Sequence, residues 1–258
     1  MQLNAALLGM LFGGGAAAGF APDAATALAT FRRATAAGAE AKGIAQERRD
    51  PVTIRALDAF AKAVGSATSI DKALADPRVL TVLLPALGLA DRTGQEALVR
   101  RALQSDPADP KGLAAQLGGV WKTAAATLRL HSDGLAKLKD PATVKLLGDG
   151  FLAYQYRRGL DEQGAGIADA LYFRDKAAAV TDAYTILGDP VMRRVVTGAL
   201  GLPDAIAVQS VEAQARAVSS RLDLDRLANP GEVQKLISRY LIARAGTGLG
   251  AGPLSLFA

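Results

Sequence analysis

The chain has 258 residues, enough for one large or two small domains. Half of the residues are apolar, aromatic residues make up only 5%, and alanine is abundant, which predicts helix nearly throughout and no substantial sheet. The chain has no cysteine, which excludes disulfides and thiolate metal sites. It has one histidine, His131, which excludes multi-histidine metal sites. The net charge of +5 is weak for this length, and basic pairs lie far apart among acidic residues, which favours solvated helix faces over a nucleic-acid surface.

An uncharged run rich in alanine and glycine occupies residues 5–21. It is short for a membrane span and no lysine or arginine precedes it, so neither stable membrane insertion nor a cleaved secretory signal is expected. We expect a loosely ordered arm that docks on the body of the protein or on a partner. The alanine-rich sequence after Pro22-Asp23 predicts one helix that reaches about Arg49.

Seven of the eleven prolines directly follow Asp or Asn. Asp or Asn at an N-cap accepts a hydrogen bond from a free backbone N–H, and proline at the first helical position loses nothing, because its N–H would have no partner there. These dipeptides therefore predict helix starts, with a few turns among them. They are Asp50-Pro51, Asp76-Pro77, Asp106-Pro107, Asp109-Pro110, Asp140-Pro141, Asp189-Pro190 and Asn229-Pro230.

Apolar residues recur every three or four positions behind Pro110, Pro141 and Pro230, which is the stripe of an amphipathic helix. The stripe behind Pro110 contains Trp121, the only tryptophan, which we expect to anchor the core. Central helices are predicted from about residue 143 to residue 184.

Two segments of the sequence match each other. The sequence LADPRVLTVLLPALGLAD begins at Leu74 and LGDPVMRRVVTGALGLPD begins at Leu187, a constant offset of 113 (187 − 74). Asp109-Pro110 and Asn229-Pro230 correspond with a shifted offset of 120 (229 − 109). This pattern predicts an internal duplication, in which Trp121 is equivalent to Leu241.

The shared Gly-Leu dipeptide explains how each copy is built. Gly88 and Gly201 are predicted to adopt positive φ and close a helix, so that Leu89 and Leu202 fold back on the last turn. Each unit is then predicted to consist of a short helix, a glycine cap and two further helices. We expect an all-α protein with three parts: an Ala/Gly-rich arm and helix (residues 1–45), a compact duplicated helical bundle (residues 46–244) and a flexible tail (residues 245–258).

The sequence ADALYFRDKAAAVTDAYTILGDPVMRRVVTGALGLPD, residues 168–204, resembles the domain-of-unknown-function family numbered twelve-seventeen. The segment from Ser69 to Leu89 and the last helix to about Arg244 are also similar, and the likeness spans roughly residues 48–244. The first 45 or so residues depart from the family pattern. The genes of this family recur in flagellar clusters of alphaproteobacteria, so the resemblance implies a role associated with the flagellum, and it assigns no catalytic residue.

No constellation of residues predicts chemistry. His131 stands in RLHSDG, where we expect the end of a helix, and the adjacent Ser132 and Asp133 do not give a nucleophile–base–orienter geometry. Asp223 and Asp225 are expected to cap a turn rather than bind a cation. Asp161-Glu162 is expected to be solvated surface. The sequence therefore predicts no catalytic, cofactor or metal site.

Two functions follow from these observations. The favoured one is a non-enzymatic interaction protein for flagellar assembly or motility, structural or accessory to export, with flagellar proteins as partners and no small-molecule substrate or cofactor. It would be cytoplasmic or flagellum-associated, with export without a cleaved signal left open. The alternative is a small basic helical module that binds nucleic acid or another acidic partner. An apolar groove near the Gly-Leu caps would favour the first function, and arginine pairs gathered on one face would favour the second.

Overall fold

A computed structural model describes residues 24–247, and the arm and tail expected at residues 1–23 and 248–258 lie outside this range. Over the described residues the protein is all helical and contains no strand, which confirms the predicted fold class. None of the helices between residues 24 and 247 combines the length and apolar character that crossing a bilayer requires.

The helices follow one another closely along the chain, with four short 3-10 turns between them. They are α2 (Ala24–Ala34), α3 (Ala39–Glu47), α4 (Pro51–Ser66), α5 (Ile70–Ala73), α6 (Pro77–Ala86), η1 (Ala90–Arg92), α7 (Glu96–Leu103), α8 (Leu113–Leu117), α9 (Gly119–Leu128), α10 (Leu130–Lys139), α11 (Pro141–Gln163), α12 (Ile167–Lys176), η2 (Ala177–Ala179), α13 (Ala183–Gly188), α14 (Pro190–Ala199), η3 (Asp204–Val208), α15 (Val211–Ser219), η4 (Leu224–Ala228) and α16 (Pro230–Thr247).

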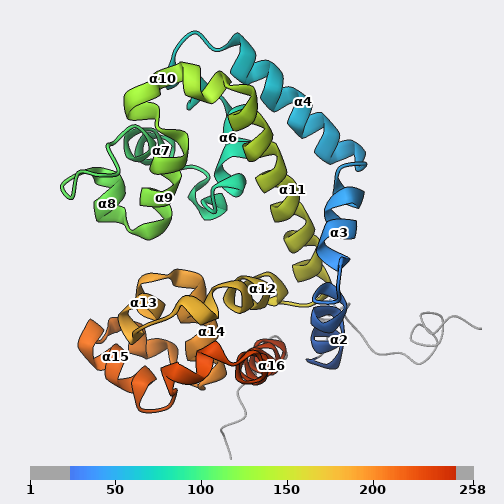
Figure 1. The fold of residues 1–258 in the computed structure, drawn as a ribbon, viewed down its shortest axis with the longest axis vertical. Helices are drawn as coiled ribbons and strands as arrows, with labels where there is room; N and C mark the ends of the chain where they lie inside the picture. Colours follow the sequence, from blue (N-terminus) through green and yellow to red (C-terminus); the bar gives the residue numbers. More distant parts are fainter. Residues whose placement is uncertain (1–23, 248–258) are drawn as a thin grey trace, which may run out of the picture.

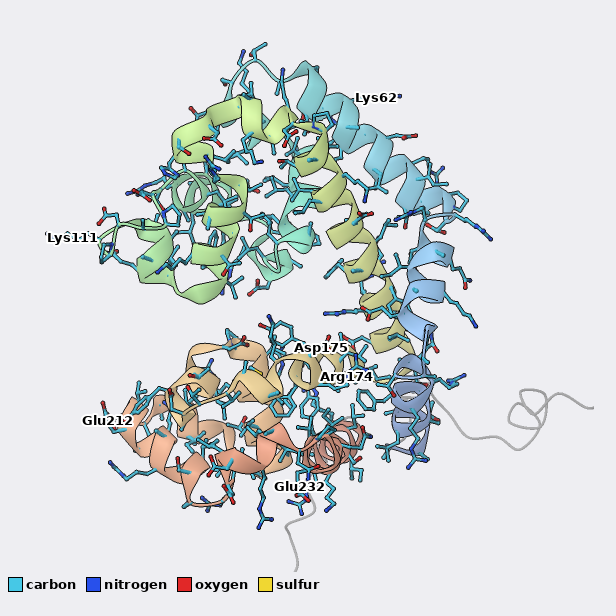
Figure 2. All side chains as sticks on the ribbon, in the orientation of Figure 1. Lys62, Lys111, Arg174, Asp175, Glu212 and Glu232 are labelled. Atoms are coloured by element: carbon cyan, nitrogen blue, oxygen red, sulfur yellow. The ribbon has the colours of Figure 1, made fainter. Side chains whose placement is uncertain are left out.

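The molecule has two lobes joined along one side by the long helix α11 (Figure 1). The first lobe consists of α4 to α10 with the first half of α11, and its core runs from Phe60 to Phe151. The second lobe consists of α12 to α16 with α2 and the end of α11, and its core includes Phe31, Leu160 and Tyr240. Side chains fill the interior of both lobes (Figure 2). The N-terminal helix α2 thus packs on the C-terminal helix α16.

Five of the seven Asp-Pro and Asn-Pro dipeptides begin helices, namely α4, α6, α11, α14 and α16. The predicted mechanism is visible at Asp50, whose side chain accepts hydrogen bonds from the backbone N–H groups of Val52 and Thr53 at 3.0 and 2.8 Å. These bonds lower the pKa of the Asp50 carboxyl, the Thr53 N–H having the largest effect.

The other two dipeptides form turns, so the helix expected directly behind Pro110 does not begin there. Asp106 and Asp109 accept from the N–H groups of Ala108 and Lys111 at 2.8 and 2.9 Å. Only one residue, Ala108, separates the two dipeptides, which leaves no room for a helical turn between them. Helix α8 starts at Leu113 instead, and Gly118 (φ 107°) separates it from α9.

Both predicted glycine caps are confirmed. Gly88 has φ 74° and Gly201 has φ 63°. The N–H of Leu89 donates to the carbonyl of Leu84 at 2.8 Å, and that of Leu202 donates to the carbonyl of Thr197 at 2.9 Å, as in a Schellman motif. The matched segments therefore share the same local structure.

The packing of the third helix of each unit differs from the prediction. Helix α14 packs chiefly against α16, whereas its counterpart α6 packs chiefly against α11 and α4. Helix α9, which carries Trp121, contacts α7, α8 and α10 instead. At the level of helix contacts α16 resembles α11 rather than α9, and the expected pairing of Trp121 with Leu241 stays a prediction. The duplication of whole units stays a prediction.

One further expectation is corrected by a positive-φ position: the helix expected up to Arg49 is two helices, because Gly38 (φ 75°) separates α2 from α3. The predicted central helices are α11 and α12, with Gly166 (φ 89°) between them. His131 lies in a single helical turn between Arg129 (φ 48°), which follows the end of α9, and Gly134 (φ 62°), where α10 is kinked.

Candidate functional site

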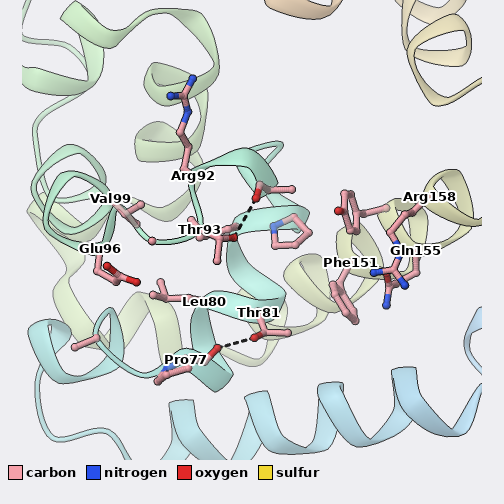
Figure 3. Close-up of a pocket in the computed structure, with 16 residues that line it drawn as sticks. Pro77, Leu80, Thr81, Arg92, Thr93, Glu96, Val99, Phe151, Gln155 and Arg158 are labelled. Atoms are coloured by element: carbon pink, nitrogen blue, oxygen red, sulfur yellow. Dashed lines mark hydrogen bonds between the residues drawn. The ribbon is translucent and has the colours of Figure 1, made fainter. Parts of the chain in front are cut away.

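A groove opens in the first lobe directly beside the Gly88 cap (Figure 3). Its volume is about 300 Å³, and its walls come from α6, the η1 turn, the start of α7 and the second half of α11. We call it the cap groove. It is formed because the Gly88 cap turns the chain away from α6 into η1 and leaves the end of α6 facing α11.

The floor of the cap groove is apolar and belongs to the core of the lobe. Leu80 and Leu84 come from the stripe of α6, Val99 from α7 and Phe151 from α11, and each is at most 8% exposed. Helices α6 and α11 approach closely here, since a Cβ on Gly150 would lie 3.0 Å from the Ala86 carbonyl oxygen. The floor is therefore rigid and already built, as in many ligand and peptide sites.

The rim of the cap groove is polar and exposed. Thr81 and Thr93 donate their hydroxyl protons to the carbonyls of Pro77 and Ala90 at 2.7 and 3.0 Å (Figure 3). Arg92 pairs with its neighbour Asp91 at 3.3 Å, and Arg158, which also lines the groove, lies 3.8 Å from Glu162. An apolar floor with a polar rim is the usual anatomy of a protein interface.

Gln155 lies in the wall of the cap groove that α11 forms. Its Oε1 atom is buried and has no hydrogen-bond partner within residues 24–247. Gln155 and Arg158 also line a second depression of about 500 Å³ at the junction of α3 and α4. The cap groove and this second depression therefore share two residues of α11, and one of them, Gln155, carries a buried acceptor without a partner among the described residues.

The residues around His131 do not assemble into a catalytic group. His131 Nε2 lies 3.7 Å from Asp106 Oδ1, while the Ser132 hydroxyl donates to Asp133 at 2.9 Å. Asp133 in turn pairs with Arg129 at 3.2 Å. The serine and the histidine thus have separate partners, and the nucleophile–base contact that acyl transfer needs is not made here.

The acidic pair Asp223 and Asp225 has the expected capping role. The Asp223 side chain accepts from the backbone N–H of Asp225 at 3.2 Å and pairs with Arg226 at 3.2 Å. Within the described part of the chain, no three His, Asp or Glu side chains gather in a way that would hold a metal ion.

Asp161 is not the solvated surface residue that the sequence indicated. It lies in the last turn of α11 and its carboxylate accepts the backbone N–H of Ala168 at 2.8 Å, which ties the end of α11 to the start of α12. Burial raises the pKa of Asp161, and the charge of Asp169 acts in the same direction. A glycine-flanked acidic pair gave no sign of this burial.

A partly buried polar cluster in the second lobe also escaped sequence reasoning. The Tyr240 hydroxyl donates to Asp169 at 2.7 Å, and Arg194 donates to both oxygens of the same carboxylate at 2.6 and 2.9 Å. Burial raises the pKa of Tyr240, with Asp169 next in effect. The three side chains satisfy one another's hydrogen bonds. They line neither the cap groove nor the depression at the junction of α3 and α4, so we assign the cluster a role in joining helices rather than in chemistry.

The chain has five arginine pairs, namely Arg32-Arg33, Arg48-Arg49, Arg100-Arg101, Arg157-Arg158 and Arg193-Arg194. One arginine in four of these pairs makes an ion pair with a carboxylate of another helix or turn. These contacts are Arg48–Asp149, Arg100–Asp71, Arg157–Glu40 and Arg194–Asp169. They are spread over both lobes, so they do not form the continuous positive stripe that nucleic-acid proteins present.

Comparison with known proteins identifies a family for the sequence and a solved structure with a similar fold. The model of a family described as "Protein of unknown function (DUF1217)" matches residues 86–233, more than half of the chain and a narrower span than the resemblance from Arg48 to Arg244. No curated protein matches. An Agrobacterium tumefaciens protein solved by X-ray crystallography in a structural genomics programme has a TM-score of 0.67 and 22% identity, with 85% of this chain and 93% of that chain covered. At this identity the likeness concerns the fold alone.

Proposed function

Because this chain belongs to the DUF1217 family of proteins of unknown function, we propose its role from its own surface: it is a non-enzymatic interaction protein of flagellar assembly or motility, cytoplasmic or flagellum-associated. The partner is a flagellar protein that inserts an apolar side chain into the cap groove. The flagellar setting comes from the sequence resemblance of residues 168–204, and the docking site comes from the groove.

The observation that carries the proposal is the apolar floor beside the Gly88 cap. Leu80, Leu84 and Phe151 are held by the core and form an apolar surface that is already in place. A partner side chain that inserts between the walls therefore buries its own apolar surface without any rearrangement of this lobe.

The proposal is tested by filling the groove from its rim. Thr81 is exposed on α6, so Thr81→Trp places an indole over the floor without altering the core. The matched control is Thr123→Trp, at an exposed position of α9 that does not line the groove. Each variant is expressed in cells from which the gene has been deleted, and swimming in soft agar is measured.

We expect the deletion to impair swimming, Thr123→Trp to restore it and Thr81→Trp to leave it impaired. Equal amounts of both folded proteins in the cells separate loss of docking from loss of stability. Normal motility after deletion would reject the flagellar role, and full rescue by Thr81→Trp would reject the groove. Salt-sensitive binding of DNA by the purified protein would instead support the basic-module alternative, against which the dispersed ion pairs of the arginines argue.

A further inference from the structure

The second lobe holds a pocket of its own, of about 590 Å³, between the end of α15, η4 and α16. Its floor is made of leucines: Leu227 and Leu236 are buried in the core of the lobe, and Leu200 and Leu222 are half-buried against it. We call it the basic pocket, for the charges on its rim. It shares no lining residue with the cap groove.

Four cations and two carboxylates line the basic pocket, which leaves a net charge of +2. Lys235 pairs with Glu232 at 2.7 Å and Arg226 with Asp223 at 3.2 Å. The Lys235 hydrogen bond lowers the pKa of Glu232, and the charges of Arg226 and Arg239 act in the same direction. Several cations thus converge on one carboxylate, which lies at the end of the molecule away from the first lobe (Figure 2).

Two of the cations remain without a carboxylate. Across residues 24–247, neither Arg221 nor Arg239 has an acidic side chain within ion-pair distance, although Arg221 donates to the Ala217 carbonyl at 3.2 Å. Both side chains are exposed at the rim above the leucines. The pocket therefore combines uncompensated positive charge with an apolar floor.

We propose that the basic pocket binds an acidic protein segment that carries a large apolar side chain. The apolar side chain covers Leu222 and Leu236, and carboxylates on either side of it pair with Arg221 and Arg239. Guanidinium groups suit this role because they bind carboxylates with two parallel hydrogen bonds. The inference does not depend on the cap groove, since the two sites lie in different lobes.

The composition of the pocket favours a protein segment over nucleic acid. Asp223 and Glu232 also line the pocket. They disfavour a phosphate backbone, which carries a negative charge at every nucleotide, more than a peptide whose few carboxylates are separated by uncharged residues. No aromatic side chain lines the pocket, so bases have no surface on which to stack. The net charge of +2 is small beside the extended positive surface that a nucleic-acid strand requires.

The test uses the whole chain and a fluorescein-labelled octapeptide of six glutamates and two leucines, followed by fluorescence anisotropy at low salt. Two further peptides replace the leucines by serine or the glutamates by glutamine. The variant is Arg221→Gln/Arg239→Gln. Its control is Arg55→Gln/Arg101→Gln, which removes the same charge from exposed positions of the first lobe.

We expect saturable binding of the acidic leucine peptide, weakened about 10-fold by Arg221→Gln/Arg239→Gln and less than about 2-fold by the control. Both altered peptides bind more weakly. Equal loss in the two variants would show only a general charge effect and overturn the site. No saturable binding up to about 1 mM peptide would overturn it as well. If the protein bound a single-stranded oligonucleotide more tightly than the peptide, the ligand of the pocket would be nucleic acid and the proposal of an acidic protein segment would be wrong.

Discussion

Gly201 holds φ at 63° with nothing within 4 Å of the place that a Cβ would occupy. A substitution there meets no neighbour, so its cost comes from the left-handed backbone alone. Gly201→Ala should lower the free energy of unfolding by about 1–2 kcal/mol. Gly159, in the middle of α11 and also free of neighbours, is the matched control, and Gly159→Ala should leave stability unchanged or raise it by about 0.5–1 kcal/mol. Urea titrations of both variants measure this, and an equal response would contradict the cap.

Asp50 makes the free energy of unfolding depend on pH, with lower stability in acid. Its folded-state pKa lies below the ordinary value, chiefly because the Thr53 N–H bonds to the carboxylate. This contribution to stability is present in full above the unfolded pKa of about 3.9 and is lost as the pH falls through the lower folded pKa. Asp50→Asn keeps a good N-cap without the titrating group, so it should match the parent near neutral pH and lose less stability below about pH 4. Parallel loss in both proteins would contradict this role.

At the scale of elements, Tyr240 joins three helices of the second lobe. It is fully buried on α16, its hydroxyl donates to Asp169 of α12, and a Cβ on Gly198 of α14 would lie 3.0 Å from its ring. Tyr240→Phe removes one hydrogen bond to a charged, partly buried carboxylate and should lower the free energy of unfolding by about 1.5–3 kcal/mol. Tyr184→Phe, on an exposed tyrosine, should change it by less than about 0.5 kcal/mol. Chemical denaturation followed by circular dichroism compares the two.

Helix boundaries with a local cause were predictable from the sequence. An Asp side chain and the proline after it decide the start of α4, α6, α11 and α14 within a few residues, and the Gly-Leu caps decide the ends of α6 and α14. Other boundaries had causes outside the local pattern. The turns at Asp106 and Asp109 depend on the spacing of the two dipeptides, and the position of the α11–α12 boundary at Gly166 coincides with a close approach of Tyr240, whose hydroxyl would lie 3.0 Å from an added Cβ.

At the scale of the whole molecule, the candidate site could not be predicted because it is made by distant segments. The start of α6 and its glycine cap were predictable, but the opposite wall comes from Phe151 and Gln155, some seventy residues later. Helix α11 carries apolar residues on more than one face because it packs against both α6 and α3. Nothing in its sequence separates a groove-lining Gln155 from a solvated one, since that depends on how the first lobe folds back on α11.

A protein partner that occupies the cap groove is detected most directly by photo-crosslinking in living cells. A photoreactive phenylalanine analogue is placed at Thr93, an exposed position on the rim, and at Thr123 as the control outside the groove. We expect irradiation of motile cells to give one discrete crosslink from position 93, to a flagellar protein, which Thr81→Trp abolishes. Position 123 should give none. No crosslink from position 93, or the same products from both positions, would contradict the proposed docking site.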